Sequence, residues 1–516
     1  MANRYLAGID IGTTGAKAII FDLTGKAIAS GYREYACVYP KPNWVEQHAP
    51  TLVSSAMEAS REAVTKAGVG PKEIASVAFS TQRSCTFFLD KTDELVRPMI
   101  SWQDQRAVAE LDEIRDKVTA ADYYEITGMP LNTTWLVSKI LWLRNHEPEN
   151  WDKVRKIIQL QDYTLRAFGV EGYVNDVPDA GFSGLWNPYE FCWSRNLLKL
   201  LAIDEQFLPR TVPSGTQVGV VSKAVAEQTG FAAGTPLCVG AGDQNSAITG
   251  AGIVNPGYCS VSLGTGGIVA AYLDAAFHDP SKMNMFTNHT IYGKWQLEGY
   301  QAGAAGVYRW FRDEIAKLQK AYANETRQDV YFFLNDLVAQ TPPGAKGLVF
   351  LPYLASATTP RWNPRARGTL LGLTFAHDQG CLARAFMEGI TLEIKDVFNS
   401  MYASGLDISH VRILGGPTKS PLWNQLQADI YNRPVDTLKT PEAAVLGAAI
   451  CAGVGVGLFK DIREGVSAMV AVDKTYEPNL QNAALYDELY AIYCQAYEGL
   501  AEKGVFDALA KIQERF

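Results

Sequence analysis

The chain has 516 residues, of which 47% are hydrophobic and 20% are charged, and its formal net charge at pH 7 is −8. This length exceeds one ordinary hydrophobic core and indicates about two to four domains. The composition excludes long disordered stretches, and the acidic balance argues against nucleic acid or an anionic membrane surface as a partner. The 8 cysteines form no CxxC pair and the 6 histidines are not spaced as metal ligands. We therefore expect a cytoplasmic protein without zinc or disulfides.

The first predicted element is a β-hairpin over residues 7–22, "AGIDIGTTGAKAIIFD". A dinucleotide fingerprint or a P-loop needs a helix after its glycines, whereas the residues after Gly15 have an extended pattern. Gly12, Thr13 and Thr14 at the tip would allow close approach to a phosphate and supply N–H and hydroxyl donors. A plain tight β-turn would explain the same spacing. The strand begins almost at once, so no signal peptide is expected.

Residues 236–252, "PLCVGAGDQNSAITGAG", predict an apolar strand that leads through two glycines into a helix of small residues. Asp243 then lies beside the helix N-terminus, where the ionised form of an acid is favoured. Asp243 is a candidate general base for phosphoryl transfer, for which a low pKa is tolerable because the proton of the nucleophile leaves late. The alternative is a helix N-cap, where aspartate is also favoured.

Residues 261–274, "VSLGTGGIVAAYLD", repeat the first hairpin at an offset of 252 residues, with Gly264 and Thr265 at the tip. An offset close to half the length predicts two structurally similar halves. Ser262 replaces Asp10 in this repeat, which indicates that the hairpin forms without a carboxylate at that position. We therefore interpret Asp10 as an acid that faces a Mg²⁺–phosphate complex rather than as a turn-capping residue.

Two segments of the second half predict further elements. Residues 411–432, "VRILGGPTKSPLWNQLQADIYN", predict a strand, a Gly–Gly turn and a helix with Ser420 as its N-cap and Pro421 in the first position. Glycines there would let a flat ring lie against the backbone, although close packing of the strand against the helix explains them equally well. Residues 443–459 are 17 uncharged residues. They are too few and too rich in alanine and glycine for a membrane span, and predict a helix buried against a sheet.

Taken in order, these segments resemble the FGGY family of carbohydrate kinases, which includes glycerol, xylulose, ribulose, gluconate and autoinducer-2 kinases. The resemblance implies an α/β fold of two actin-like, ribonuclease H-like ATPase domains with a central cleft. We predict a sugar-binding domain with the catalytic base over residues 1–252 and a domain with the adenosine site over residues 253–516. The matching segments are "GIDIGTTGAKAIIFD", "NWVEQHAP", "STQRS", "RPMISWQDQRA", "GAGDQNSA", "VSLGTGG", "PRWNPRARGTLLGL", "LGGPTKSPLWNQLQAD" and "PEAAVLGAAICAG".

The resemblance also implies a role for each matching residue. Asp243 corresponds to the catalytic base of the family and Asp10 to its magnesium-associated acid, and the implied cofactors are ATP and Mg²⁺. The phosphate hairpins correspond to Gly12, Thr13, Thr14, Gly264 and Thr265, and the adenosine-binding turn corresponds to Gly415, Gly416 and Ser420.

The sequence differs from those of glycerol and xylulose kinases in the segment that contacts the substrate in this family. Glycerol kinases have Gln-Arg-Glu at this point and hold glycerol hydroxyls with the arginine and the glutamate, and xylulose kinases have Met-His-Gly. Here Gln82 and Arg83 match the glycerol kinases, but Ser84 is shorter and uncharged. We expect an open-chain polyol or ketose, with Arg83 donating to two hydroxyl groups, Trp102 as an apolar wall and Gln244 holding a further hydroxyl. The alternatives are a surface ion pair for Arg83 and a core position for Trp102.

The predicted activity is transfer of the γ-phosphoryl group of ATP to a terminal hydroxyl of a small polyol or ketose, as the two halves close and exclude water. A second class, represented by actin and the heat-shock chaperones, would hydrolyse ATP whether or not a sugar is present. A third, an inactive sugar sensor, would bind sugar without phosphate transfer. The expected partner is a small sugar or polyol, and a homodimer is left open.

Overall fold

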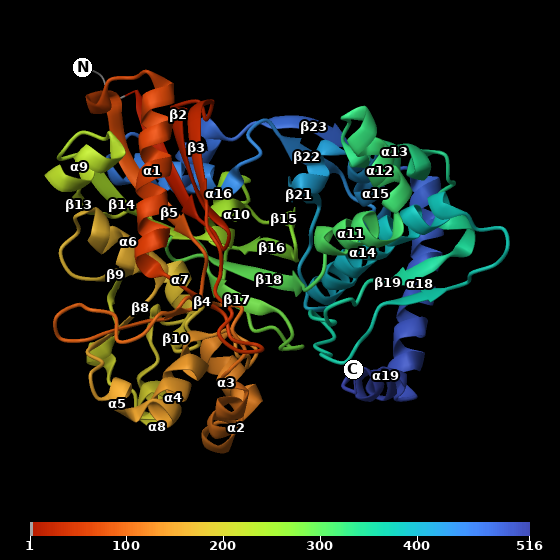
Figure 1. The fold of residues 1–516 in the computed structure, drawn as a ribbon, viewed down its shortest axis with the longest axis horizontal. Helices are drawn as coiled ribbons and strands as arrows, with labels where there is room; N and C mark the ends of the chain where they lie inside the picture. The colour runs from red at the N-terminus through yellow and green to blue at the C-terminus, as the bar shows by residue number, and fades with distance from the viewer. Residues whose placement is uncertain (1–3, 516) are drawn as a thin grey trace.

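The computed structural model describes residues 4–515, which form two α/β halves side by side (Figure 1). The first half contains a six-stranded sheet of order β13-β14-β5-β1-β2-β3 and the second a seven-stranded sheet of order β17-β18-β16-β15-β21-β22-β23. The strands of the first sheet are β1 (Tyr5–Ile11), β2 (Gly15–Asp22), β3 (Ala27–Glu34), β5 (Ile74–Thr81), β13 (Gln217–Val220) and β14 (Pro236–Gly242). Those of the second are β15 (Tyr258–Leu263), β16 (Gly267–Leu273), β17 (Met285–Asn288), β18 (Trp295–Gln301), β21 (His410–Gly415), β22 (Val435–Leu438) and β23 (Val472–Tyr476).

The two sheets share one topology. In each, an antiparallel hairpin (β1–β2 or β15–β16) has a third antiparallel strand on one side and two parallel strands on the other. The order β3-β2-β1-β5-β14 therefore corresponds to β18-β16-β15-β21-β22. The duplication that the repeated glycine–threonine tips predict is confirmed.

The two hairpin tips differ by one residue. In the first, Ile11 pairs with Ala16 and the N–H of Gly12 donates to the carbonyl of Gly15 at 3.0 Å. In the second, Leu263 pairs with Gly267, and the N–H of Gly264 donates across a tip that is one residue shorter. The repeat in the sequence therefore fixes where each tip begins, while the register of the returning strand differs between the halves.

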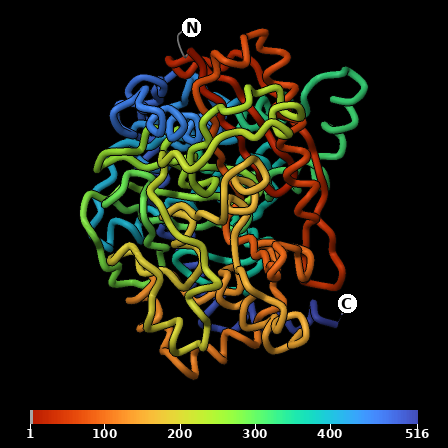
Figure 2. Tube along the Cα trace, turned by 90° about the vertical axis from the view of Figure 1, so that its left-hand side faces the viewer, coloured from red at the N-terminus to blue at the C-terminus, as the bar shows by residue number. Residues whose placement is uncertain are grey.

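Helices cover both faces of the first sheet, and one of them comes from the second half. The helix α1 (Ala49–Ala67) covers one face, and α16 (Ala443–Gly455) covers the other. Leu446 and Ile450 of α16 belong to the same hydrophobic core cluster as Leu6 of β1. Figure 1 shows this blue helix behind the first strands of the chain, and Figure 2 shows blue segments beside the red ones at the same end of the molecule. The helix predicted over 443–459 is thus buried against a sheet, as expected. The domain boundary at 252/253 stays a prediction.

The helices α10 (Asp243–Gly250) and α16 cross with their backbones almost in contact. A Cβ atom added at Gly447 would lie 1.9 Å from the carbonyl oxygen of Ser246, and one added at Gly250 would lie 1.9 Å from that of Ala443. Only glycine permits this approach. Asp243 is the first residue of α10. The crossing of the two helices therefore joins the two halves of the molecule next to Asp243.

Among the remaining elements, the helices that follow β7 (Met99–Ile100) in the first half contribute to a separate hydrophobic core, which includes Leu136, Ile140 and Leu197. Among residues 4–515, no helix is long and apolar enough to span a membrane. The other helices are α2 (Val108–Lys117), α3 (Ala120–Thr127), α4 (Leu136–His146), α5 (Pro148–Trp151), α6 (Leu160–Phe168), α7 (Val177–Gly181), α8 (Arg195–Leu201), α9 (Lys223–Thr229), α11 (Ala305–Trp310), α12 (Lys317–Thr326), α13 (Val330–Ala339), α14 (Gln379–Ala403), α15 (Pro421–Tyr431), α17 (Ile462–Met469), α18 (Leu480–Glu502) and α19 (Val505–Gln513). The short strands are β4 (Glu46–Gln47), β6 (Phe87–Leu89), β7 (Met99–Ile100), β8 (Lys156–Ile158), β9 (Val174–Asp176), β10 (Trp186–Asn187), β11 (Cys192–Trp193), β12 (Arg210–Val212), β19 (Val349–Leu351) and β20 (Thr369–Leu371).

Candidate active site

Asp243 lies at the junction that the sequence predicts, directly after β14 and as the first residue of α10. Its side chain is 31% exposed, and its Oδ1 accepts the N–H of Gln244 at 2.7 Å. Burial raises the pKa of Asp243 above its ordinary value, and the guanidinium of Arg83 opposes this rise. The expectation of a low pKa at this helix N-terminus is therefore corrected, because the loss of water outweighs the helix dipole. A raised pKa makes the carboxylate a better proton acceptor.

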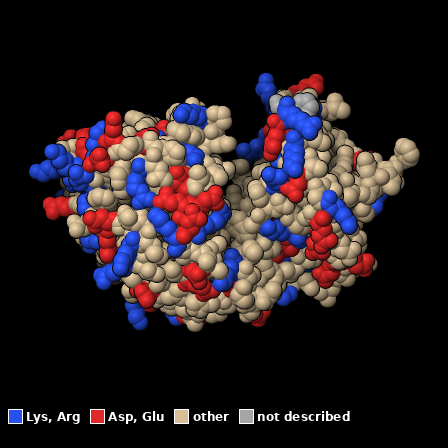
Figure 3. All heavy atoms as spheres, turned by 90° about the horizontal axis from the view of Figure 1, so that it is seen from below, with Lys and Arg blue, Asp and Glu red and all other residues tan. Residues whose placement is uncertain are grey.

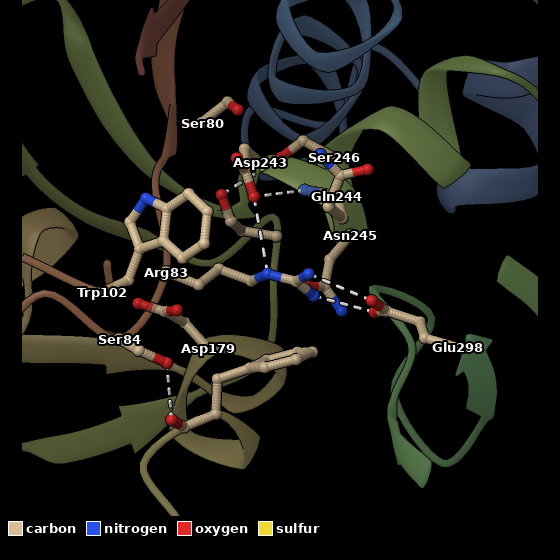
Figure 4. A network of polar contacts seen from close by, with 12 residues as sticks. Ser80, Arg83, Ser84, Trp102, Asp179, Asp243, Gln244, Asn245, Ser246 and Glu298 are labelled. Carbon is tan, nitrogen blue, oxygen red and sulfur yellow. Dashed lines mark hydrogen bonds and ion pairs between the residues drawn. The ribbon is translucent and has the colours of Figure 1, made fainter. Parts of the chain in front are cut away.

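Arg83 follows β5 and extends between the two halves (Figure 4). Its Nε lies 3.4 Å from Oδ1 of Asp243, and its Nη1 and Nη2 donate to the two carboxylate oxygens of Glu298 at 2.8 and 3.0 Å. The guanidinium carbon lies 3.6 Å from the ring centroid of Phe182. The Arg83 side chain is only 11% exposed and its partner is fully buried, which excludes the alternative of a surface ion pair.

Asp10 lies near the end of β1, where Ser80 donates to its Oδ1 at 2.6 Å. Burial raises the pKa of Asp10 to about 7, and the nearby carboxylate of Asp243 contributes to this rise. Ser80 engages only one of the two oxygens, and Oδ2 would be available to a cation or its water shell. Carboxylate oxygen and water are the ligands that Mg²⁺ prefers, and the residues present fit such an ion.

The oxygen atoms of the first hairpin tip accept hydrogen bonds from neighbouring side chains. The carbonyl of Gly12 accepts from the hydroxyl of Tyr35 at 2.6 Å, and the carbonyl of Thr13 accepts from Nε2 of Gln47 at 2.8 Å. The hydroxyl of Thr13 accepts from Nε1 of Trp102 at 3.0 Å. The N–H of Gly12 is used within the hairpin, whereas the N–H groups of Thr13 and Thr14 have no acceptor among the described residues and would be available to a ligand. Thr14 is exposed at this tip, as are Gly264 and Thr265 at the other.

The Gly–Gly turn lies beside the second tip. Gly415 pairs with Leu263 in the parallel ladder, and its φ is +94°, with an added Cβ atom 2.3 Å from the carbonyl oxygen of Leu263. Only glycine fits there, and both Gly415 and Gly416 are exposed. The predicted N-cap is present: Ser420 accepts the N–H of Trp423 at 3.2 Å. Its hydroxyl also donates to Oδ1 of Asn335 at 3.1 Å, so the hydroxyl of Ser420 is already engaged.

Two family models match the chain in the order of the two halves. The N-terminal domain of the FGGY family of carbohydrate kinases matches residues 5–250, and the C-terminal domain of that family matches residues 259–456. The chain belongs to the FGGY family of carbohydrate kinases. It is therefore an ATP-dependent carbohydrate kinase with the two-domain actin-like, ribonuclease H-like fold that the sequence predicts.

Relatives with different named substrates are similar to this FGGY kinase to nearly the same degree. The chain is 29% identical over 500 residues to a xylulose kinase of Staphylococcus epidermidis, covering 96% of this chain and 97% of the relative. It is 30% identical over 490 residues to a glycerol kinase of Oleidesulfovibrio alaskensis, covering 93% and 95%. The structure of a ligand-bound xylulose kinase from Lactobacillus acidophilus has a TM-score of 0.88 at 27% identity, covering 96% of this chain and 98% of that one.

Two residues that the sequence assigned to the substrate lie inside the first half of this FGGY kinase. Gln82 is 1% exposed, and its Nε2 donates at 2.7 Å to Gln47, the residue that donates to the carbonyl of Thr13 in the first tip. Ser84 is also 1% exposed, with φ at +58°, and its hydroxyl donates to the carbonyl of Phe182 at 2.8 Å. The hydroxyl of Ser84 is used within the fold, whereas Oε1 of Gln82 is buried without a hydrogen-bond partner among residues 4–515, and the substrate contacts expected for both side chains stay predictions.

Trp102 and Gln244 lie beside Asp243 (Figure 4). The indole of Trp102 is only partly buried and faces Arg83 and Asp243. Seen from below, the molecule is hollowed between its two halves, and charges of both signs are interspersed on this face (Figure 3). Nothing in the sequence reasoning pointed to Glu298. The strand "WQLEGYQ" contains two glutamines besides this glutamate, so its sequence gives no signal that the acid is buried beside a cation.

Proposed function

We propose that this FGGY kinase phosphorylates the terminal hydroxyl of an open-chain polyol or ketose held between Arg83, Trp102 and Asp243. The observation that carries the proposal is the pairing of a partly exposed carboxylate of raised pKa with a buried guanidinium 3.4 Å away. The carboxylate can accept the proton of one hydroxyl while the guanidinium donates to its neighbour. Xylulose and glycerol, the substrates named for two relatives, both end in a hydroxymethyl group beside a carbon that carries a hydroxyl.

In the proposed reaction, Asp243 takes the proton of the terminal hydroxyl as the oxygen forms a bond to the γ-phosphorus of ATP. The bond from that phosphorus to the bridging oxygen breaks, and ADP leaves with the electron pair. At the tips Gly12–Thr14 and Gly264–Thr265, the N–H groups that are not used within the hairpins would stabilise the negative charge of the transferring group. Asp10 would hold Mg²⁺, which when bound neutralises phosphate charge. Gly415 and Gly416 would lie against the adenine.

The experiment that tests this proposal measures ADP formation with a panel of three- to six-carbon polyols and ketoses, including glycerol, erythritol, erythrulose and the pentuloses. We expect ADP formation to depend on the added sugar and one panel member to stand out in kcat/KM. ATP hydrolysis that is indifferent to every panel member would instead support a conformational ATPase. Sugar binding without any phosphate transfer would support a sensor.

A further inference from the structure

Glu298 lies where the two halves meet, beside the candidate sugar site. Its strand β18 belongs to the second sheet, and its side chain is fully buried. Its carboxylate accepts from Nη1 and Nη2 of Arg83, at 2.8 and 3.0 Å, and from Nε2 of Gln296. A two-point, charge-assisted contact of this kind fixes the orientation of a guanidinium as well as its position. The orientation of an arginine in the first half is thus set by the second half.

The contacts of Arg83 leave one edge of its guanidinium for a substrate. A guanidinium has five N–H donors. Glu298 takes two of them, and Oδ1 of Asn245 accepts a third from Nη1 at 3.2 Å. The donors that remain are Nε–H and the second N–H of Nη2, which lie along the same edge of the planar group. This edge faces Asp243, whose Oδ1 is 3.4 Å from Nε (Figure 4).

We propose that Glu298 is a positioning residue, which turns the Nε–Nη2 edge of Arg83 toward the substrate and keeps the guanidinium from closing onto Asp243. This inference rests on the phosphoryl transfer proposed above. Two parallel donors match two oxygen atoms on adjacent carbons. The substrates that fit are therefore polyols and ketoses that end in a vicinal diol, with the terminal oxygen nearest Asp243.

Other carboxylates compete for Arg83 once Glu298 carries no charge. Asp243 is already 3.4 Å from Nε. Asp179 lies below Arg83 in Figure 4 and is fully buried, and neither of its carboxylate oxygens has a hydrogen-bond partner within residues 4–515. A buried guanidinium is stable only beside a counter-charge, so neutral Glu298 should release Arg83 toward one of these acids. If the guanidinium of Arg83 paired with Asp243, neither its Nε–Nη2 edge nor the carboxylate of Asp243 would be available to the substrate.

The test is the variant Glu298→Gln, which keeps the shape of the side chain and removes its charge. We expect the KM for the best panel substrate to rise about 10- to 100-fold, and the KM for ATP to change less than about twofold. Glu298→Asp should recover part of the loss. A role confined to folding would lower the active fraction, and so the apparent kcat, without raising the sugar KM.

A matched control is Glu393→Gln in the same half. Glu393 is a second buried glutamate and accepts from Nε2 of Gln301, on the same strand as Glu298, at 2.8 Å. This control should keep the sugar KM of the wild type. The wild type should also bind an analogue that lacks the hydroxyl next to the terminal one more weakly, whereas Glu298→Gln should discriminate less between the two. A Glu298→Gln enzyme with the KM and discrimination of the wild type overturns the proposal.

A separate measurement distinguishes failure of this inference from failure of the proposed function. If no panel sugar supports ADP formation by the wild type, the proposed function fails. The orientation of Arg83 is then read from its Nε–Hε NMR resonance, assigned with Arg83→Lys. A resonance that shifts in Glu298→Gln but not in Glu393→Gln supports the positioning of Arg83 by Glu298, and an unchanged resonance refutes it.

Discussion

The buried carboxyl group of Glu393 should make the stability of this kinase fall as the pH rises. Glu393 lies on α14 and is 2% exposed. Its Oε2 accepts from Gln301, while its Oε1 is buried without a partner within the described part of the chain. Burial raises the pKa of Glu393 from 4.5 to about 8, and the hydrogen bond from Gln301 opposes this rise. The folded protein therefore favours the protonated carboxyl group.

The sign and the size of the effect follow from this difference. A carboxyl group whose pKa is raised on folding stabilises the folded protein fully at pH values below 4.5. This contribution to the free energy of unfolding declines as the pH rises to about 8 and is constant above that pH. Each pKa unit corresponds to about 1.4 kcal/mol, so the loss between pH 5 and pH 8.5 is on the order of 4 kcal/mol. Since domains are stable by only about 5–15 kcal/mol, this loss is large enough to measure.

The assay is urea unfolding of the wild type and Glu393→Gln at several pH values from 5 to 8.5. Glutamine can still accept from Gln301 but cannot ionise. We therefore expect similar free energies of unfolding at pH 5 and a more stable variant at pH 8.5. Glu502→Gln, at the exposed end of α18, is the control and should follow the wild type. If the curves for wild type and Glu393→Gln stay parallel across this range, the carboxyl group does not titrate as argued.

Three other changes test the site. Asp243→Asn should fold normally but lose about 10²–10⁴ in kcat, because the amide cannot accept the proton; wild-type turnover would remove the base assignment. Asp10→Asn should need more Mg²⁺ for half-maximal activity, and an unchanged magnesium titration would contradict its role. Gly447→Ala should destabilise the protein by about 1–3 kcal/mol and lower kcat, because the new Cβ atom would lie 1.9 Å from the carbonyl of Ser246, one turn after Asp243. The control Gly499→Ala, with nothing within 4 Å of the new Cβ atom, should be neutral or slightly stabilising in thermal unfolding. Equal stability of the two alanine variants would refute the close-approach argument.

The sequence by itself determined the features that depend on neighbours along the chain. The glycine–threonine tips, Asp243 at a strand–helix junction, Ser420 as an N-cap and the buried helix after Glu442 all follow from short-range patterns. Such patterns reflect backbone conformation, capping and the burial of one face, which act over a few residues. The repeat at 252 residues also revealed two halves of like topology, because equal folds need equal local signals.

Only the tertiary structure decided which polar groups meet. Arg83 and Glu298 are 215 residues apart and pair because the two halves pack against each other at this point. Ser84 turns inward because its backbone adopts a left-handed conformation and its hydroxyl finds a carbonyl inside the fold. The pKa of Asp243 is raised although it lies at a helix N-terminus. Desolvation depends on every group that surrounds a side chain in space, and a local pattern does not contain that information.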